Sequence, residues 1–218
     1  MSRRTRIKIC GLTREADVDA AVEAGADALG FVLYPKSARA VTAARAGELA
    51  ARLPGFVTPV LLFVNASEAE IAAGLAAVPQ ALLQFHGDES PEACQAGPAR
   101  GRPYLRAARM TPELPLLDFA RAHERAAGLV LDAHVEGYGG GGKAFDWSLV
   151  PHDLPCPVVL SGGLSPANVI DGITRLKPWA VDVSSGVEVG KGLKDAGLMR
   201  QFCTAVQEAD ARLADLDG

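Results

Sequence analysis

Three side chains capable of acid–base chemistry stand at or near the ends of short apolar runs: Cys10, Asp132 and Asp182. A thiolate can remove a proton and a carboxyl group can donate one, so Cys10 and Asp132 are candidates for a general base and a general acid. Both also have a structural interpretation, since a cysteine after a strand is often a small buried apolar residue and an aspartate there can cap a helix. Asp182 lies inside its run, where a carboxylate needs a donor such as a sugar hydroxyl or a backbone N–H.

Glycine and serine residues follow two later apolar runs in a pattern typical of phosphate-binding loops. Gly162 and Gly163 come after the first of these runs, and Ser184, Ser185 and Gly186 come after the second. Glycines let backbone N–H groups approach an anion, and serine hydroxyls add further donors. The glycines could also serve only as tight turns, but their presence in both loops favours a phosphate site.

Other polar residues are candidates for the walls of a substrate-binding site. Arg39 lies in a polar loop after an apolar run, and arginine can bind a carboxylate through two parallel hydrogen bonds. Arg106 is a candidate of the same kind. His86 follows another run and is expected in the wall of the site or in a turn. The segment Lys191–Asp195 is expected to be a solvated turn before the last helix.

The acid–base pair would need unusual pKa values. At reference values of about 8.5 for cysteine and 3.9 for aspartate, few Cys10 thiols are ionised and few Asp132 carboxyls are protonated at pH 7. A helix is expected to begin at Thr13, and a thiol beside a helix N-terminus has a lowered pKa. Burial and a bound phosphate are expected to raise the pKa of Asp132.

The apolar runs are continuous rather than alternating, which is typical of strands covered on both faces. They are Ile7–Cys10, Ala28–Leu33, Val57–Val64, Ala81–Phe85, Pro103–Ala107, Gly128–Asp132, Pro157–Ser161 and Trp179–Val183. Amphipathic stretches between them predict helices at Glu15–Ala24, Thr42–Arg52, Ser67–Val78, Ser90–Gln95, Pro112–Arg125, Pro166–Leu176 and Asp195–Leu213. Ser67 and Glu70 match a capping box. Ser90, Thr111 and Ser165 each precede a proline, which marks a helix start.

Eight strand candidates, most of them followed by helices, predict a parallel sheet with helical crossovers. An open dinucleotide-binding sheet would carry GxGxxG after its first strand, whereas this chain has Cys10-Gly11-Leu12-Thr13 there. We therefore expect an α/β fold, a single (β/α)8 TIM barrel with an outer helix ring, formed by residues 1–218 as one domain. Its active site would lie at the carboxyl ends of the strands. Glycines in 137–142 predict a long mobile loop, and a short helix is expected near Trp147.

Composition narrows the classes of function. Of 218 residues, 49% are hydrophobic and 22% charged, which excludes a disordered tail protein. With 22 Lys and Arg against 26 Asp and Glu, the net charge of −4 predicts neither a nucleic-acid nor a membrane partner. Cysteine and histidine show no metal-ligand spacing, and no stretch reaches the roughly 18 apolar residues of a membrane span. We expect a cytoplasmic protein with no metal.

Several of these segments together resemble phosphoribosylanthranilate isomerase of tryptophan biosynthesis. They are Lys8-Ile9-Cys10-Gly11-Leu12-Thr13, Tyr34-Pro35-Lys36-Ser37, Gln84-Phe85-His86-Gly87, Gly142-Lys143-Ala144-Phe145-Asp146-Trp147, Ser161-Gly162-Gly163-Leu164 and Asp182-Val183-Ser184-Ser185-Gly186-Val187-Glu188. They follow the family's order and cover nearly the whole chain. The first and last of these motifs are individually specific.

The resemblance implies an Amadori rearrangement of N-(5′-phosphoribosyl)anthranilate to 1-(2-carboxyphenylamino)-1-deoxyribulose 5-phosphate without a cofactor. It implies that Asp132 protonates the furanose ring oxygen and that Cys10 removes the C2′ proton. It further implies that Arg39 binds the anthranilate carboxylate and that Asp182 contacts a ribose hydroxyl. The implied phosphate-binding residues are Gly162, Gly163, Ser184, Ser185 and Gly186.

Gly141, Phe85 and Ala38 depart from the residues common in that family, which bears on loop dynamics and substrate affinity more than on the reaction. Two other functions stay open. One is another sugar-phosphate isomerase, such as that of histidine biosynthesis, although such enzymes usually use a carboxylate pair. The other is a non-catalytic barrel that binds a phosphorylated ligand. The expected partner is a small phosphorylated substrate, and the chain is expected to be a monomer or a homodimer.

Overall fold

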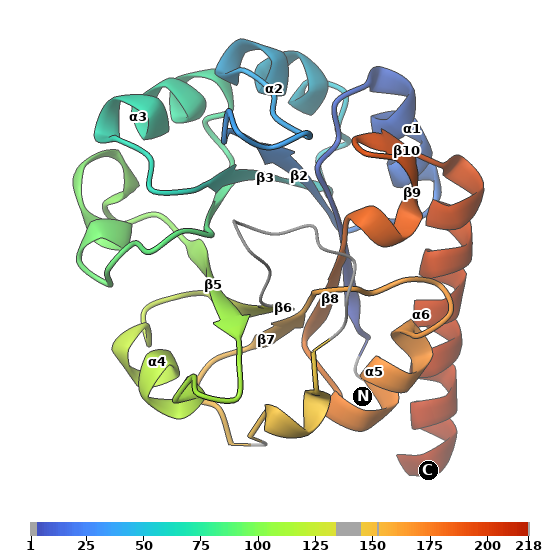
Figure 1. Ribbon diagram of the computed structural model, residues 1–218. Coiled ribbons are helices and arrows are strands. Elements are labelled where there is room, and N and C mark those ends of the chain that lie inside the picture. The colour runs from blue at the N-terminus through green and yellow to red at the C-terminus, as the bar shows by residue number, and fades with distance from the viewer. Residues whose placement is uncertain (1–3, 134–144, 152, 218) are drawn as a thin grey trace.

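The computed structural model describes residues 4–133, 145–151 and 153–217. Eight parallel strands close into a barrel in sequence order, with β1 hydrogen-bonded to both β2 and β8 (Figure 1). The strands are β1 (Arg6–Cys10), β2 (Ala28–Val32), β3 (Thr58–Phe63), β4 (Leu82–Phe85), β5 (Tyr104–Met110), β6 (Gly128–Ala133), β7 (Val158–Leu160) and β8 (Ala180–Val183). All eight predicted strands are present, and the predicted TIM-barrel class is confirmed.

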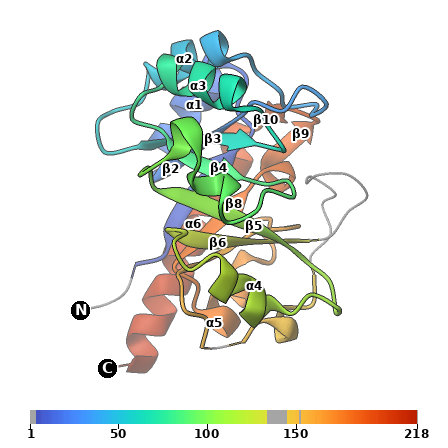
Figure 2. The ribbon, with the colours of Figure 1, turned by 90° about the vertical axis from the view of Figure 1, so that its left-hand side faces the viewer.

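Helices surround the barrel in the described part of the chain. The α-helices are α1 (Glu15–Glu23), α2 (Ala43–Ala50), α3 (Glu68–Ala77), α4 (Leu116–Ala122), α5 (Val169–Leu176) and α6 (Ala196–Asp217). The 3-10 turns are η1 (Ala93–Gln95), η2 (Gly97–Ala99), η3 (Trp147–Leu149) and η4 (Ser185–Val187), and a hairpin of β9 (Glu188–Gly190) and β10 (Leu193–Lys194) follows β8. In Figure 2 the two chain ends lie on the left and this hairpin lies at the upper right. No described helix is long and apolar enough to cross a membrane.

Some helix starts agree with the sequence and others do not. The capping box is present, since Ser67 Oγ accepts from Glu70 N and the Glu70 carboxylate accepts from Ser67 N. The starts predicted after Thr111 and Ser165 are wrong, because α4 begins at Leu116 and α5 at Val169. For α4 the physical reason is Pro115, which disfavours helical backbone at the residue before it.

The segment after β4 also differs from its prediction. The Ser90 hydroxyl accepts from Ala93 N, as expected of a cap, but only the turns η1 and η2 follow instead of an α-helix. Gly97 has a φ of +48° and is followed by Pro98, so the helical backbone cannot continue past this point. The short helix expected near Trp147 is present as η3.

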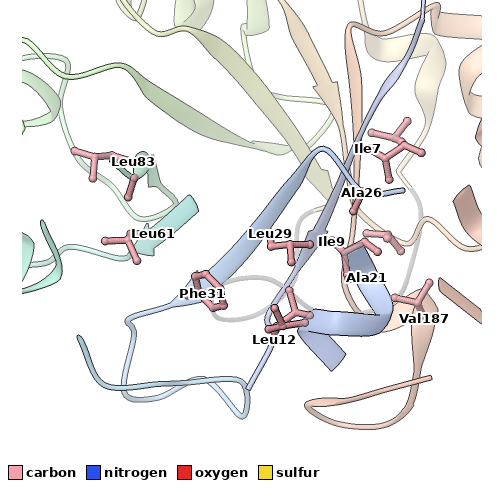
Figure 3. Packing of buried hydrophobic residues seen from close by; sticks show 14 of the residues in the cluster. Ile7, Ile9, Leu12, Ala21, Ala26, Leu29, Phe31, Leu61, Leu83 and Val187 are labelled. Atoms are coloured by element: carbon pink, nitrogen blue, oxygen red, sulfur yellow. The ribbon is translucent and has the colours of Figure 1, made fainter. Parts of the chain in front are cut away.

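The alternation of side chains along β1 decides which residues reach the barrel interior. Ile7 and Ile9 belong to the large core cluster between the strands and α1, in which Leu29 and Ala21 also lie (Figure 3). Because successive side chains of a strand point to opposite faces, Lys8 and Cys10 point the other way, into the barrel. The same alternation along β8 places Asp182 inside, since Val181 and Val183 belong to the outer cluster.

The barrel interior is apolar toward the amino ends of the strands and polar near their carboxyl ends. Its apolar cluster consists of Leu105, Ala107, Val130, Val159 and Ala180. Two residues further along their strands, Val130 is followed by Asp132 and Ala180 by Asp182. Both carboxylates are buried near the carboxyl ends of the strands, which is where active sites of TIM barrels lie.

Candidate active site

Cys10 ends β1 and is buried inside the mouth of the barrel. It packs against Gly30 of the neighbouring strand β2, where a Cβ atom would lie 2.6 Å from the Cys10 Sγ. That distance is well below a van der Waals contact, so any larger residue at position 30 would displace the thiol. The glycine of β2 therefore holds the space for the candidate base.

Asp182 has a partner that the sequence did not suggest. Its Oδ2 lies 2.9 Å from Nζ of Lys8, and the two residues are paired across β8 and β1. The two side chains are only 4% (Lys8) and 6% (Asp182) exposed, so this is an ion pair inside the barrel. The second oxygen, Oδ1, is buried and has no hydrogen-bond partner among the described residues. A buried acceptor of this kind is costly unless a ligand donates to it.

The environment of the Cys10 thiol differs from the expectation. The helix α1 begins at Glu15 with Arg14 as its N-cap, and not at Thr13. Burial raises the pKa of the Cys10 thiol, and the Asp182 carboxylate raises it further, while the Lys8 ammonium lowers it. The net pKa is above the ordinary thiol value, so in the ligand-free protein Cys10 is held as a thiol.

This raised pKa predicts how Cys10 reacts. Alkylation of Cys10 by iodoacetamide should reach half of its maximal rate above pH 8.5, the rough value for an unperturbed thiol. Replacing Lys8 with methionine should move the midpoint higher still, because the nearby cation is lost. Mass spectrometry of the peptide that carries Cys10 measures the rate of alkylation at this residue. It distinguishes alkylation of Cys10 from alkylation of the other buried cysteines, Cys94, Cys156 and Cys203. A midpoint near neutrality would contradict the raised pKa.

Asp132 lies one residue before the end of β6 and belongs to a hydrogen-bonded chain of buried side chains. Its Oδ2 lies 3.0 Å from Nε2 of His86, and Nδ1 of His86 lies 3.1 Å from Nε2 of Gln84. Gln84 and His86 are two residues apart on β4 and its end, so they share one face. His86 therefore contacts the candidate acid directly. Gln84 also belongs to this chain of side chains, although the sequence analysis did not single it out.

The two predicted phosphate loops contact each other and Asp132. A Cβ atom at Gly186 would lie 1.8 Å from the carbonyl oxygen of Leu164, so only glycine permits this approach. Gly162 has a φ of +75°, and a Cβ there would lie 2.3 Å from the Ala133 nitrogen and 3.0 Å from Asp132 Oδ1. The loops after β7 and β8 thus contact each other, and the loop after β7 lies beside the carboxyl end of β6.

Asn168 orders the first of these loops and was not singled out from the sequence. Its Nδ2 donates to the Gly163 carbonyl at 2.9 Å, and its Oδ1 accepts from Ser165 N at 2.8 Å. Gly163 has a φ of +68°, a left-handed backbone that favours glycine. The N-cap predicted at Ser165 is therefore replaced by Asn168, which directly precedes α5.

Ser184, in the second loop, makes contacts within the protein. Its hydroxyl donates to the Cys10 carbonyl at 3.0 Å, and Lys194 Nζ donates to the Ser184 carbonyl at 2.9 Å. Ser185 begins the turn η4. The prediction of a solvated turn at Lys191–Asp195 is wrong for Lys194, whose side chain is buried because the β9–β10 hairpin folds it back toward Glu188.

Arg39 is held in place by a carboxylate at the barrel mouth. Its Nε and one terminal nitrogen donate to the two oxygens of Glu188, at 2.7 and 2.8 Å. Lys194 also contacts Glu188, at 2.7 Å. Burial raises the Glu188 pKa, but the two cations outweigh this and hold it below its usual range. Gly11, with a φ of +80°, lies against the Arg39 side chain. The guanidinium thus presents its remaining N–H groups from a fixed position.

Arg106 does not share this site. Its side chain has the parity of Tyr104 on β5, which faces the helix layer, and it lies over the ring of Phe119 in α4 at 5.4 Å. Its guanidinium donates to the backbone carbonyls of Phe85, Gly87 and Ala107. The interpretation of Arg106 as a second carboxylate-binding arginine is therefore wrong, since its guanidinium binds backbone carbonyls of β4, of β5 and of the loop after β4 from the helix side of the barrel.

No group of three or more His, Cys, Asp or Glu side chains within residues 4–133, 145–151 and 153–217 is arranged to hold a metal ion. The predicted mobile loop at 137–142, with Gly141, lies outside the described residues.

Comparisons with known proteins agree on one family. The profile of the family "N-(5′phosphoribosyl)anthranilate (PRA) isomerase" matches residues 7–205. The chain is 68% identical over 211 residues to the N-(5′-phosphoribosyl)anthranilate isomerase of Methylibium petroleiphilum, covering 97% of this chain and 98% of that one.

Solved structures agree with this match. Phosphoribosyl anthranilate isomerase from Thermotoga maritima superposes with a TM-score of 0.86 at 38% identity, covering 94% of this chain and 99% of that chain. A phosphoribosyl anthranilate isomerase in complex with reduced 1-(o-carboxyphenylamino)-1-deoxyribulose 5-phosphate superposes with a TM-score of 0.83 at 35% identity, with the same coverage. The barrel, the polar mouth and these matches together identify the chain as an isomerase that belongs to the N-(5′-phosphoribosyl)anthranilate isomerase family.

Proposed function

We propose that this protein converts N-(5′-phosphoribosyl)anthranilate to 1-(2-carboxyphenylamino)-1-deoxyribulose 5-phosphate in tryptophan biosynthesis, with Asp132 as general acid and Cys10 as general base. The observation that carries the proposal is the burial of a thiol and a carboxyl group at the same end of one barrel. A related isomerase with a reduced form of this product bound lends further support.

The first step opens the furanose ring. Asp132 gives a proton to the ring oxygen, the bond from that oxygen to C1′ breaks, and the anthranilate nitrogen supplies its electron pair to form a protonated Schiff base. His86 contacts only Oδ2 of Asp132, and Oδ1 lies toward Gly162, which leaves Oδ1 as the oxygen that carries the proton. This step requires the protonated form of the Asp132 carboxyl group.

The second step removes the proton from C2′. Cys10 takes it as a thiolate, and the electron pair left on C2′ moves to the Schiff base and forms an enolamine, which tautomerises to the ketone. The Lys8 ammonium lowers the pKa of Cys10 against the effect of burial. In the ligand-free protein Asp182 accepts from Lys8. A ribose hydroxyl that donates to Asp182 Oδ1 would share the negative charge of that carboxylate. Asp182 would then neutralise the Lys8 ammonium less fully, and Lys8 would stabilise the Cys10 thiolate more strongly.

The substrate carries a negatively charged group at each end, a phosphate and the anthranilate carboxylate. We assign its phosphate to Gly162, Gly163, Ser184, Ser185 and Gly186. The contact between the two loops that carry them supports a shared phosphate site, with backbone N–H groups as the main donors because the Ser184 hydroxyl already donates to Cys10. We assign the anthranilate carboxylate to Arg39, whose remaining N–H groups are not used by Glu188.

Purified protein tests the function directly. Phosphoribosylanthranilate is fluorescent, and its consumption should proceed far above the uncatalysed rate. A substrate of the histidine pathway should be converted much more slowly, since the site pairs a thiol with a carboxyl group instead of two carboxylates. Binding of the reduced product analogue without turnover would favour a non-catalytic binding protein and overturn the proposal.

The Arg39 assignment makes a prediction of its own. Arg39→Ala should raise KM about ten- to hundredfold with a smaller effect on kcat, because a charged hydrogen bond to the substrate is lost and the reacting groups are untouched. Steady-state kinetics measure both constants. Arg45→Ala removes a comparable ion-paired arginine from the surface of α2 and should leave KM unchanged. An unchanged KM in Arg39→Ala would place the carboxylate elsewhere.

Three broader expectations accompany this function. We propose that residues 1–218 form one barrel domain, because the barrel strands run from Arg6 to Val183 and α6 closes the ring. We also propose a cytoplasmic location and a monomeric or homodimeric state. Size-exclusion chromatography with light scattering tests the last of these.

A further inference from the structure

We propose that Gln84 is a positioning residue that fixes the tautomer of His86, with the ring proton on Nε2, so that His86 donates to Asp132 and holds one of its carboxyl oxygens in place. The inference rests on the proposed role of Asp132 as general acid. It is carried by the buried chain of three side chains that runs from β4 to the end of β6.

The hydrogen-bond partners specify the tautomer of His86. Gln84 presents its amide nitrogen to Nδ1 at 3.1 Å, and an amide nitrogen can only donate. The Nδ1 atom must therefore accept, which means that it carries no proton. The single ring proton then lies on Nε2, which donates to Asp132 Oδ2 at 3.0 Å. The imidazole thus pins one carboxylate oxygen in a fixed direction.

The same arrangement distinguishes the two oxygens of Asp132. Oδ2 is held by Nε2 of His86, whereas Oδ1 lies beside Gly162 and is the oxygen left to act on a substrate. Gln84 therefore acts on Asp132 through the His86 ring, by keeping Nε2 as the donor.

The tautomer depends on the orientation of the Gln84 amide. Gln84 is fully buried, its Nε2 is the atom beside Nδ1 of His86, and its Oε1 has no hydrogen-bond partner among the described residues. A reversed amide would present an acceptor to Nδ1 and require the ring proton there, so a measurement of the tautomer also reports the orientation of the amide.

Other ionisable groups share the barrel mouth with this chain, and a substitution at Gln84 leaves them in place. Arg109 on β5 is the register partner of Asp132 on β6 and forms an ion pair with Asp88. The groups around the His86–Asp132 pair in the described residues are Lys8, Cys10, Asp88, Glu89, Arg109 and Asp182. A change in pH dependence that is specific to Gln84 variants therefore reports on the amide.

Nuclear magnetic resonance of ¹⁵N-labelled protein without substrate tests the tautomer. The His86 ring is assigned as the signal set that His86→Gln removes, and it should show a neutral ring with the proton on Nε2 at neutral pH. Gln84→Glu, which keeps the shape but can only accept, should protonate Nδ1 and give an imidazolium. In the same variant kcat at pH 7 should fall about tenfold and its acidic limb should move by about one pH unit. Gln84→Met should give a mixture of tautomers.

Controls separate positioning from folding. Gln95→Met makes the same substitution in η1, away from His86, and should leave the tautomer and the pH profile unchanged. Thermal unfolding of each variant verifies that it is folded. A proton on Nδ1 in the unsubstituted protein, or a neutral ring and an unchanged pH profile in Gln84→Glu, would overturn the inference. Failure of the proposed function is recognised separately, as absence of turnover in the unsubstituted enzyme, because the tautomer is measured without substrate.

Discussion

Asp132→Asn is expected to lower kcat by about 10²- to 10⁴-fold while KM changes little. Asparagine keeps the size of the side chain, and its amide oxygen can still accept from His86 Nε2. What it lacks is a proton of suitable acidity for the ring oxygen, so the ring cannot open by acid catalysis. An interaction that acts only in the transition state lowers kcat and kcat/KM together, and the kinetics of the variant should show that pattern.

The measurement is the fluorescence assay with purified variant and saturating phosphoribosylanthranilate. Asp118→Asn, a neutralisation on the exposed surface of α4, is the matched control and should retain normal turnover. Binding of the reduced product analogue should persist in Asp132→Asn, which shows that the barrel mouth is intact. A kcat within a fewfold of normal would remove Asp132 from the role of general acid.

Cys10→Ala is expected to cause a comparable loss of kcat, because it removes the thiolate that is proposed to take the C2′ proton. Cys10→Ser should be nearly as inactive, since a hydroxyl is far less acidic than a thiol and cannot be ionised by the Lys8 ammonium at neutral pH. Cys203→Ala, which removes a buried cysteine from α6, should keep its activity.

The two variants should stop at different steps, which distinguishes acid from base. In Cys10→Ala the ring still opens, so the Schiff base should accumulate and be reduced by cyanoborohydride to a trapped amine, which mass spectrometry detects. In Asp132→Asn trapping should not exceed the uncatalysed level. Equal trapping in both variants, or turnover by Cys10→Ser at the normal rate, would contradict the assignment of the two roles.

Part of the site follows from the strand pattern alone. Continuous apolar runs predicted the eight strands, and the end of each run predicted which residues stand at the barrel mouth, including Cys10 and Asp132. This works because side chains alternate strictly along a strand, so that residues two apart share one face. The closed parallel barrel then brings all strand ends to one side of the molecule.

Helix boundaries were less predictable because they depend on exceptions to local rules. Ser67 forms its capping box with Glu70 because both groups lie within one turn. The N-cap of α4 was predicted at Thr111, but the observed N-cap is Pro115, and α4 begins after that proline. The start of α1 at Glu15 agrees with the helix predicted at Glu15–Ala24, but the pKa of Cys10 is set by burial and by the charges of Lys8 and Asp182 instead of a helix start at Thr13.

The sequence by itself determined the class of fold, the side of the barrel that carries the site and the types of residue that line it, because these depend on periodicity within each strand. Only the tertiary structure decided the partners: Lys8 with Asp182, His86 with Asp132, and Arg39 with Glu188. Each pair joins segments far apart in the chain, and its formation depends on strand register and closure of the barrel. The direction of the Cys10 pKa was decided in the same way, since burial and neighbouring charges act through space and not along the sequence.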